Sequence, residues 1–469
     1  MNRYDWEVTR MGSMARCAGL CVLLAASLAA ATSLPAAASQ LPNPATLLAA
    51  QTPQPELPAG QICYKIEIEA DGLYTVSYEA LLAAGLNVTH TPPLSLALSW
   101  RGQPVAVEDV GDGDQVFEPG EGLRFFGLKF HASVQDEKYT DTDVYWLGVS
   151  EAGGARIQSR PADLPGDLPP LGWFTDTLRA EASRAWWSRW TNKPQSSDTW
   201  FWDYVNTTQT VTRVYTTSVP FPASGDYAII VRANAVARES SLYGFRQHHL
   251  RFSFNDALVA DTSWYGGSQG PERTVSRSLD TAYLLSGTNS LTMTVLTDTT
   301  SREQLFFNWF ELTYRRAFTA AGGELRFSLI SSGVVTVAGL SLPDARAYDT
   351  SIPTQPVRIA LPTSGPVSFE AGPGSYWLSS PGAERAPARL SRYSVPELDP
   401  PGGADYVIIT HASLLAQAER LAAFHTGRGL KVAVADAADL YNQYNGGVYH
   451  PEAIRRYLWH AYDTWPRRP

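Results

Sequence analysis

Short runs of alternating apolar and polar residues, separated by Gly, Pro, Asn and Asp, recur along the chain from residue 61 to residue 398. The first run, CYKIEIE, places Tyr64, Ile66 and Ile68 on one side of a strand, and Asp71-Gly72 marks the turn into the next run. Such alternation is typical of antiparallel sheets that bury one face. The sequence therefore predicts a mainly β chain, and its 469 residues favour several domains over one.

Changes in composition and spacing divide this β region into parts. Regularly spaced runs such as DYAIIVRANA and LFFNWFELTYRR are typical of an antiparallel sandwich, whereas Pro-rich and Trp-rich stretches indicate connections. We predict a β-rich N-terminal domain at 61–157 with a short helix at 78–84, a Pro/Trp-rich connector at 158–205, a jelly-roll-like β-sandwich at 206–316, and a small β domain with a Pro/Gly hinge at 317–400.

Residues 1–38 have the three parts of a secretory signal peptide. Three arginines precede an apolar run at 17–31, and a small-residue motif, AAA, stands before Ser39. The run is shorter than the roughly 20 residues that span a bilayer, which argues against a membrane anchor. We predict a secreted or cell-surface protein, a Pro/Ala-rich linker at 39–60, and no transmembrane segment once the signal is removed.

Charge and cysteine content exclude several classes of function. The chain has 37 Lys and Arg against 46 Asp and Glu, a formal net charge of −9, which argues against nucleic acid as a partner. Cys17 and Cys21 fall inside the signal, so Cys63 is the one cysteine expected in the exported chain. One thiol forms neither an internal disulfide nor a cysteine-based metal site. Cys63 lies in a strand-like run, and we interpret it as a buried apolar residue.

Five tryptophans crowd into residues 186–202 of the connector: Trp186, Trp187, Trp190, Trp200 and Trp202. Indole rings stack on the faces of sugar rings, so this cluster can be interpreted as a glycan-binding platform. Large aromatic rings also bury 150–250 Å² each where domains pack against one another. We favour packing, and glycans remain a possible partner of the β-sandwich region.

An acidic cluster in VEDVGDGDQVFEPGEG provides the candidate metal ligands Asp112, Asp114 and Glu118, with Asp109 and Glu121 beside them. Carboxylates at this density can hold calcium, but the spacing does not fit an EF-hand loop. The alternative is an acidic turn in which Gly and Asp provide the backbone geometry. The adjacent His248 and His249 alternate across a strand, so they are not expected to ligate one ion together.

The hydrophobic period changes after the hinge. The run DYVIIT predicts a strand buried on both faces, and Leu414, Ala418, Leu421 and His425 then share one face of a helix. LKVAVADA predicts a second strand. An irregular stretch is expected from Asp439, and Pro451 then begins a last helix. The shared face of that helix is expected to carry Ile454, Leu458, Ala461, Tyr462 and Trp465. A right-handed crossover places the two strands side by side and parallel, and two strands with two helices form an incomplete domain.

This C-terminal sequence resembles the opening part of gingipain-type cysteine peptidase domains. Such domains begin with a D-Y-hydrophobic-I-I-T-H strand and an A-E-R-L-A helix, followed by a G-L-K-V strand, a D-hydrophobic-Y loop, a G-G turn and a P-E-A-I-R helix. Each element is present between 404 and 469, in that order. The stretches DGLYTVSYEALLAAGLNV and DVYWLGV are similar to the front ends of such exported peptidases.

The resemblance implies a caspase-like α/β fold, a Cys/His dyad, no required cofactor, and protein or peptide substrates. The dyad is expected beyond Pro469, so no catalytic residue is assigned within the chain, and His411, His425, His450 and His460 match neither motif. His411 is expected to be structural and His450 to cap a helix. Gingipain-like domains often hold calcium, but those ligands are expected mostly beyond this chain.

The leading hypothesis is an exported gingipain-type cysteine endopeptidase, of which this chain carries the signal, a prodomain-like β region and the first part of the catalytic domain. The chain itself is expected to be inactive. One alternative is a non-catalytic cell-surface or carbohydrate-binding protein. Another is a sortase-like peptidase that anchors cargo at the cell surface, which only the substrate would distinguish.

Overall fold

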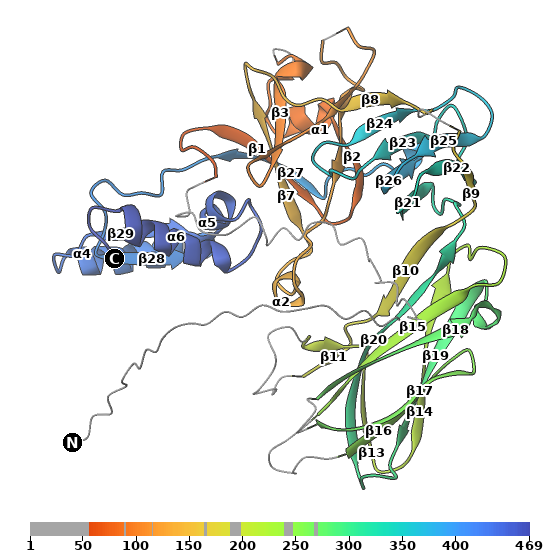
Figure 1. Cartoon of the computed structure of the whole chain (residues 1–469). Coiled ribbons are helices and arrows are strands. Elements are labelled where there is room, and N and C mark those ends of the chain that lie inside the picture. The colour runs from red at the N-terminus through yellow and green to blue at the C-terminus, as the bar shows by residue number, and fades with distance from the viewer. Residues whose placement is uncertain are drawn as a thin grey trace, which may run out of the picture. The chain divides into compact units, whose positions relative to one another are not determined.

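The computed structural model describes residues 56–88, 91–114, 116–163, 167–187, 198–238, 247–266 and 271–469 (Figure 1). The predicted signal peptide and most of the predicted linker lie outside these residues. The predicted fold class is confirmed: β-sheets dominate up to the hinge, and a helix-rich α/β segment follows it.

Two sheets enclose the core of the N-terminal β domain. Their orders are β27-β1-β7-β3-β4 and β2-β6-β5. The strands are β1 Ile62–Ile68, β2 Gly72–Ser77, β3 Leu96–Trp100, β4 Gln103–Val105, β5 Glu108–Val110, β6 Gly122–Gly127, β7 Asp143–Val149 and β27 Arg389–Ser394, with short helices α1 Tyr78–Ala83, η3 Pro93–Ser95 and α2 Val134–Glu137. The short helix predicted at 78–84 is α1, and it is closed by Gly85, whose φ of +89° favours glycine. Strand β27 comes from residues that the sequence assigned to the small β domain.

The β-sandwich consists of two antiparallel sheets, seen in yellow to green in Figure 1. One has the order β10-β20-β15-β18, with β13 also paired to β20, and the other has the order β14-β19-β16-β17. The strands are β10 Phe174–Glu181, β13 Asp203–Thr207, β14 Val211–Val219, β15 Ala228–Ala237, β16 Gln247–Phe254, β17 Ala257–Tyr265, β18 Glu272–Asp280, β19 Gly287–Leu296 and β20 Glu303–Arg316, with a 3-10 turn η4 Thr281–Tyr283. Inward side chains such as Phe252, Phe307 and Phe310 are fully buried between the sheets. The FNWFELTYRR run lies in β20, which is central in its sheet and pairs with β10, β13 and β15.

A small hairpin, β11 Ala185–Trp186 and β12 Trp200–Phe201, lies beside the sandwich. The connector predicted at 158–205 thus contributes β10 and β13 to the sandwich as well as this hairpin. The alternation in these strands is carried largely by Thr, Asp and Arg on the exposed side, which is why the sequence pattern alone did not reveal them.

The small β domain also contains two sheets, of order β21-β26-β23-β24-β8 and β25-β22-β9. The strands are β8 Gln158–Pro161, β9 Pro170–Leu171, β21 Glu324–Leu329, β22 Gly333–Val337, β23 Arg346–Asp349, β24 Val357–Ala360, β25 Val367–Ala371 and β26 Gly374–Ser379, with a 3-10 turn η5 Pro381–Ala383. Strands β8 and β9 pair in parallel with β24 and β22. The chain therefore contributes two strands to this domain before it forms the sandwich.

The C-terminal segment is a two-stranded parallel sheet with three helices. Its elements are β28 Tyr406–Thr410, η6 Ala412–Leu414, α4 Leu415–Thr426, β29 Val432–Asp436, α5 Ala437–Tyr444 and α6 Glu452–Thr464. The predicted parallel pairing is confirmed. The irregular stretch predicted from Asp439 is wrong, because α5 already begins after Asp436. The Asp436 carboxylate accepts a hydrogen bond from the Ala438 amide at 2.9 Å and caps this helix.

Candidate functional site

The C-terminal segment is held together by one face of α6. Ala453, Tyr457 and Ala461 recur every four residues along this helix and are fully buried. Leu458 and Tyr462 were predicted on the packed face but are 40% and 57% exposed, so the buried face is rotated from the predicted one. The face packs on a cluster that also contains Ala433, Ala435, Leu440, Tyr444 and Trp465.

Helix α4 and strand β28 are much less buried than the sequence predicted. Of the α4 residues only Ala418 is buried, whereas Leu414 and Leu421, which share its predicted stripe, are 55% and 43% exposed. Every residue of β28 keeps at least partial exposure. The prediction of a strand buried on both faces is therefore wrong for these residues. The reason is that a two-stranded sheet with so few covering elements leaves much of its apolar surface open.

Two histidines of the segment stabilise helix starts. The Nδ1 atom of His411 accepts a hydrogen bond from the Ser413 amide at 3.2 Å, before α4. The Nδ1 atom of His450 accepts one from the Glu452 amide at 3.1 Å, at the start of α6. The predicted capping role of His450 and the structural role of His411 are both observed.

The other two histidines are also used in packing. His460 is 4% exposed, and its Nε2 lies 2.8 Å from Oδ2 of Asp399 in the hinge. Asp399 also accepts a hydrogen bond from the indole of Trp465 at 2.9 Å, which ties the hinge to α6. The ring of His425 lies 4.5 Å from that of Tyr406, centroid to centroid.

Cys63 is buried, as predicted, and its surroundings do not activate the thiol. It is 6% exposed, in a cluster with Val144, Trp146 and Val395, and its Sγ lies 3.8 Å from the carbonyl oxygen of Tyr393. Burial raises the pKa of the thiol to about 11. A nucleophilic cysteine requires a thiolate, so this site does not support catalysis by Cys63.

This environment gives a direct prediction for thiol labelling. In the chain from Ser39 onward, Cys63 should react with dithionitrobenzoate at pH 7.5 at least roughly a hundredfold more slowly than a free thiol, because little thiolate forms and the sulfur is covered. Labelling should become complete after unfolding in guanidinium chloride. Fast labelling of the folded chain would contradict the buried, neutral thiol.

The predicted G-G turn packs against the N-terminal β domain. The indole Nε1 of Trp146 donates a hydrogen bond to the carbonyl oxygen of Gly446 at 2.9 Å. Gly447 has a φ of +97°, and a Cβ added there would lie 2.6 Å from Cγ1 of Val144. Only a glycine can take this conformation and approach β7 so closely. The G-G motif therefore joins the C-terminal segment to the first domain.

Side chains on either side of the turn extend this contact. The Tyr393 hydroxyl of β27 donates a hydrogen bond to Oδ1 of Asp439 in α5 at 2.9 Å. Nε2 of His450 lies 3.1 Å from Oδ1 of Asp136 in α2. The N-terminal β domain thus contacts both α5 and the start of α6.

The acidic candidates form a hydrogen-bonded turn. Oδ1 of Asp112 accepts from the Asp114 amide at 3.1 Å, and Oδ1 of Asp114 accepts from the Val116 amide at 2.8 Å. The two carboxylate oxygens of Glu121 accept from the amides of Asp112 and Glu118. Within the described ranges, no three His, Cys, Asp or Glu side chains are arranged to hold a metal ion. These contacts agree with the acidic-turn interpretation of the sequence.

His248 and His249 lie on opposite faces of β16, as predicted. His248 is 2% exposed, and its Nδ1 lies 2.7 Å from Oε2 of Glu303. His249 lies between Asp261 and Asp298 on the outer face. Burial alone would lower the pKa of His249, but the hydrogen bonds that the carboxylates of Asp261 and Asp298 accept from its ring outweigh burial and hold the pKa above its ordinary value. The two histidines therefore make separate contacts, one with a buried carboxylate and one with two carboxylates on the outer face.

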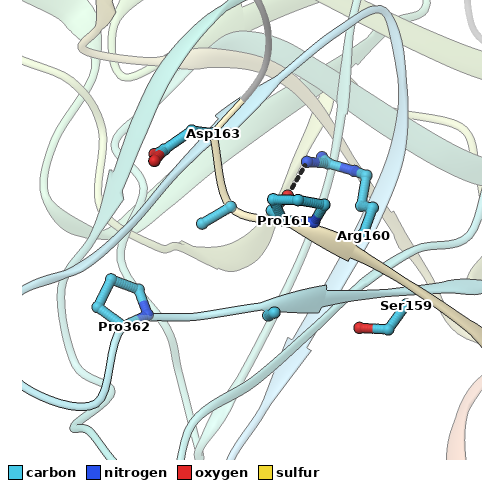
Figure 2. A pocket seen from close by; sticks show the side chains of 7 residues that line it. Ser159, Arg160, Pro161, Asp163 and Pro362 are labelled. Carbon is cyan, nitrogen blue, oxygen red and sulfur yellow. Dashed lines mark hydrogen bonds between the residues drawn. The ribbon is translucent and has the colours of Figure 1, made fainter.

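A shallow hollow lies at the edge of the small β domain, where β8 pairs with β24 (Figure 2). It has a volume of about 540 Å³ and is lined by Ser159, Arg160, Pro161, Ala162, Asp163, Ala360 and Pro362. The Arg160 guanidinium donates hydrogen bonds to the carbonyl oxygens of Pro161 and Glu370, at 2.8 and 3.0 Å. The Arg160 cation is thus used to hold two backbone carbonyl groups in place.

The tryptophans of the connector separate into two kinds. Trp187 is 5% exposed and Trp202 is partly buried in the sandwich, so packing, the favoured interpretation, holds for these two. Trp186 and Trp200 are 62% and 43% exposed, so the packing interpretation does not hold for these two. Trp190 lies outside the described residues.

The fold and these sites define a multidomain, mainly β protein whose C-terminal segment is a small α/β unit. Residues 399–469 match the model of Peptidase family C25. This match confirms the resemblance of the C-terminal segment to gingipain-type cysteine peptidases. No curated protein sequence matches the chain.

Solved structures extend the likeness beyond this segment. Dimeric latent PorU from Porphyromonas gingivalis matches with a TM-score of 0.64 and 14% sequence identity, over 86% of this chain and 40% of that chain. The fold is therefore shared across most of the chain, which spans less than half the length of PorU. A family 35 carbohydrate binding module from Clostridium thermocellum matches 30% of the chain with 16% identity, but its TM-score of 0.17 supports no inference.

In the part of the chain that the structure describes, no helix is both long and apolar enough to cross a bilayer.

Proposed function

We propose that residues 404–469 form the opening part of a gingipain-type peptidase domain in a longer, exported cysteine endopeptidase. The observation that carries this proposal is the C25 match at 399–469, on a segment whose β28-α4-β29 unit and last helix, α6, occur in the expected order. In such an enzyme a thiolate activated by a histidine attacks the peptide carbonyl. The dyad is supplied by later strands of the same α/β domain.

Within that enzyme the residues of this chain position the first strands of the catalytic domain. The G-G turn and α5 are held against the N-terminal β domain by Trp146 and Tyr393. The hinge is fixed to α6 by Asp399. Residues 1–38 direct the protein out of the cell, and protein or peptide chains are its substrates.

A peptide-cleavage experiment tests whether the catalytic dyad lies outside the residues of this chain. The chain from Ser39 to Pro469 should cleave no member of a broad fluorogenic peptide library, with or without a thiol blocker. A longer protein that continues this segment into a Cys and a His motif should cleave peptides, and replacing either residue should lower the rate at least about a thousandfold. Blocker-sensitive cleavage by the Ser39–Pro469 chain that disappears in Cys63→Ser would overturn the proposal.

A further inference from the structure

The β11–β12 hairpin is fixed to the outside of the sandwich by its inner face. Trp187 and Phe201 are 5% and 0% exposed and pack on Val236 and Phe306. The rings of Trp187 and Phe306 are nearly parallel, at 15°, with centroids 5.0 Å apart. The backbone is bonded as well, because the amide of Trp202, next to the hairpin, donates to the carbonyl oxygen of Phe307 at 2.9 Å. The hairpin is therefore a supported element of the fold.

The outer face of the same hairpin presents two indoles to solvent. Trp186 and Trp200 are directly opposite each other in the ladder and are 62% and 43% exposed. Their ring planes differ by 23° and their centroids are 6.1 Å apart. The two indoles are thus stacked on each other at a distance within the range for offset stacking, and a large part of each ring surface is open to solvent.

The backbone of Trp200 is itself held in place. Oδ1 of Asp198 accepts hydrogen bonds from the amides of Thr199 and Trp200, at 2.6 and 2.9 Å. With the ladder contact to β11, this fixes the start of β12 and limits the conformational entropy that a ligand must remove on binding. Two preorganised, exposed indoles are the kind of surface that serves recognition, since large rings are otherwise buried.

We propose that Trp186 and Trp200 form a carbohydrate-binding platform for a flat glycan chain of β-1,4-linked glucose-type units. Such sugars carry all their ring hydroxyls at the rim and leave a face of C–H groups. The electron-rich face of an indole attracts these C–H groups, and two neighbouring indoles can take two neighbouring sugar rings. Trp202, another member of the tryptophan cluster, is not part of the platform, because it packs against the sandwich core.

The size of the platform favours a glycan over a protein partner. Two indoles exposed to this extent offer on the order of 250 Å² of surface. A stable protein–protein interface needs about 800 Å² from each partner, so a second copy of the chain would need much more than this pair.

Titration with cellohexaose and with N-acetylchitohexaose tests the platform in the Ser39–Pro469 chain. Calorimetry and tryptophan fluorescence should detect binding of at least one of these hexasaccharides. Trp186→Ala and Trp200→Ala should each weaken it at least about tenfold, and Trp186→Phe should weaken it less because an aromatic face remains. Trp173→Ala is the matched control, since Trp173 is 40% exposed but stacks on Arg315 away from the pair.

Three outcomes would overturn the proposal. Neither hexasaccharide binds the folded chain, or binding is unchanged in both alanine variants, or the wild-type chain sediments as a dimer that Trp186→Ala dissociates. The last outcome would assign the pair to self-association. Circular dichroism of each variant separates loss of binding from loss of the fold, and failure here leaves the peptidase proposal untouched, because that rests on residues 399–469.

Discussion

Gly447→Ala is expected to detach the C-terminal segment from the N-terminal β domain, at a cost of about 3 kcal/mol. Two penalties add at this position. The backbone has a φ of +97°, where a Cβ is strained, and the added Cβ would lie 2.6 Å from Cγ1 and 2.9 Å from Cβ of Val144. The neighbouring atoms belong to a buried strand, so they cannot move aside cheaply. Hydrogen exchange of the α5 and α6 amides should become much faster, while exchange in the β-sandwich should not change.

Gly429→Ala separates the two penalties. Gly429 has a φ of +89°, but a Cβ added there would meet nothing within 4 Å. Its substitution should therefore cost only about 1 kcal/mol, from backbone strain alone. Val144→Ala combined with Gly447→Ala should recover part of the loss, because both methyl groups of Val144 are removed while its Cβ remains. Equal effects of Gly447→Ala and Gly429→Ala would show that the close approach to Val144 contributes nothing.

The elements that could be predicted from sequence are those whose pattern is set locally. Strands such as β15 and β20 have strong alternation, and β28 and β29 are short apolar runs bounded by turn residues. Helix α5 escaped prediction because its buried side chains include Asn442 and Gln443, which look like loop residues. Strands β17 and β18 escaped because their polar residues hide the alternation.

The pairing of distant segments could not be read from the sequence. Strand β27 joins β1 across more than three hundred residues, and β8 joins β24 across two hundred. Pairing of this kind depends on backbone hydrogen bonds and tertiary packing, which leave no local signal. The C-terminal segment, in contrast, could be recognised from local sequence motifs. The G-G and P-E-A-I-R motifs identified the segment, but the role of Gly447 became visible only through its contact with Val144.

A buried ion cluster shows how tightly the N-terminal and small β domains are joined. Arg124 of β6 has a side chain that is 6% exposed, and it contacts Glu108 of β5 at 3.1 Å and Glu384 at 3.0 Å. Glu108 also accepts a hydrogen bond from the Tyr348 hydroxyl of β23 at 2.6 Å. In the sequence Arg124, Glu108 and Glu384 are charged residues well separated from one another, and Glu108 lies beside the acidic turn. In the structure they bond one domain's sheet to the other's.

Arg124→Met is expected to destabilise this pair of domains by about 3–5 kcal/mol at pH 7, because it leaves Glu108 and Glu384 buried without their shared cation. The midpoint of urea unfolding of the two β domains, followed by tryptophan fluorescence, measures the loss. Arg358→Met is the matched control. Arg358 also pairs with Glu108, but its side chain is 47% exposed, so its removal should cost at most about 1 kcal/mol.

Acidification should change the stability of the wild type and of Arg124→Met in opposite directions. Burial alone would raise the pKa of Glu108, but Tyr348, Arg358 and Arg124 outweigh it and hold the pKa below its ordinary value of 4.5. In the wild type this carboxylate therefore stabilises the fold above the pKa of the unfolded chain, and the contribution is lost as the pH falls through the lower, folded pKa. Without Arg124, burial of Glu108 is less well compensated and favours the protonated carboxyl group, so acidification from pH 7 to about 5 should reduce the destabilisation of the variant. The difference between wild type and Arg124→Met should thus shrink on acidification, and a difference that stays constant over this range would mean that Arg124 acts through packing instead of charge.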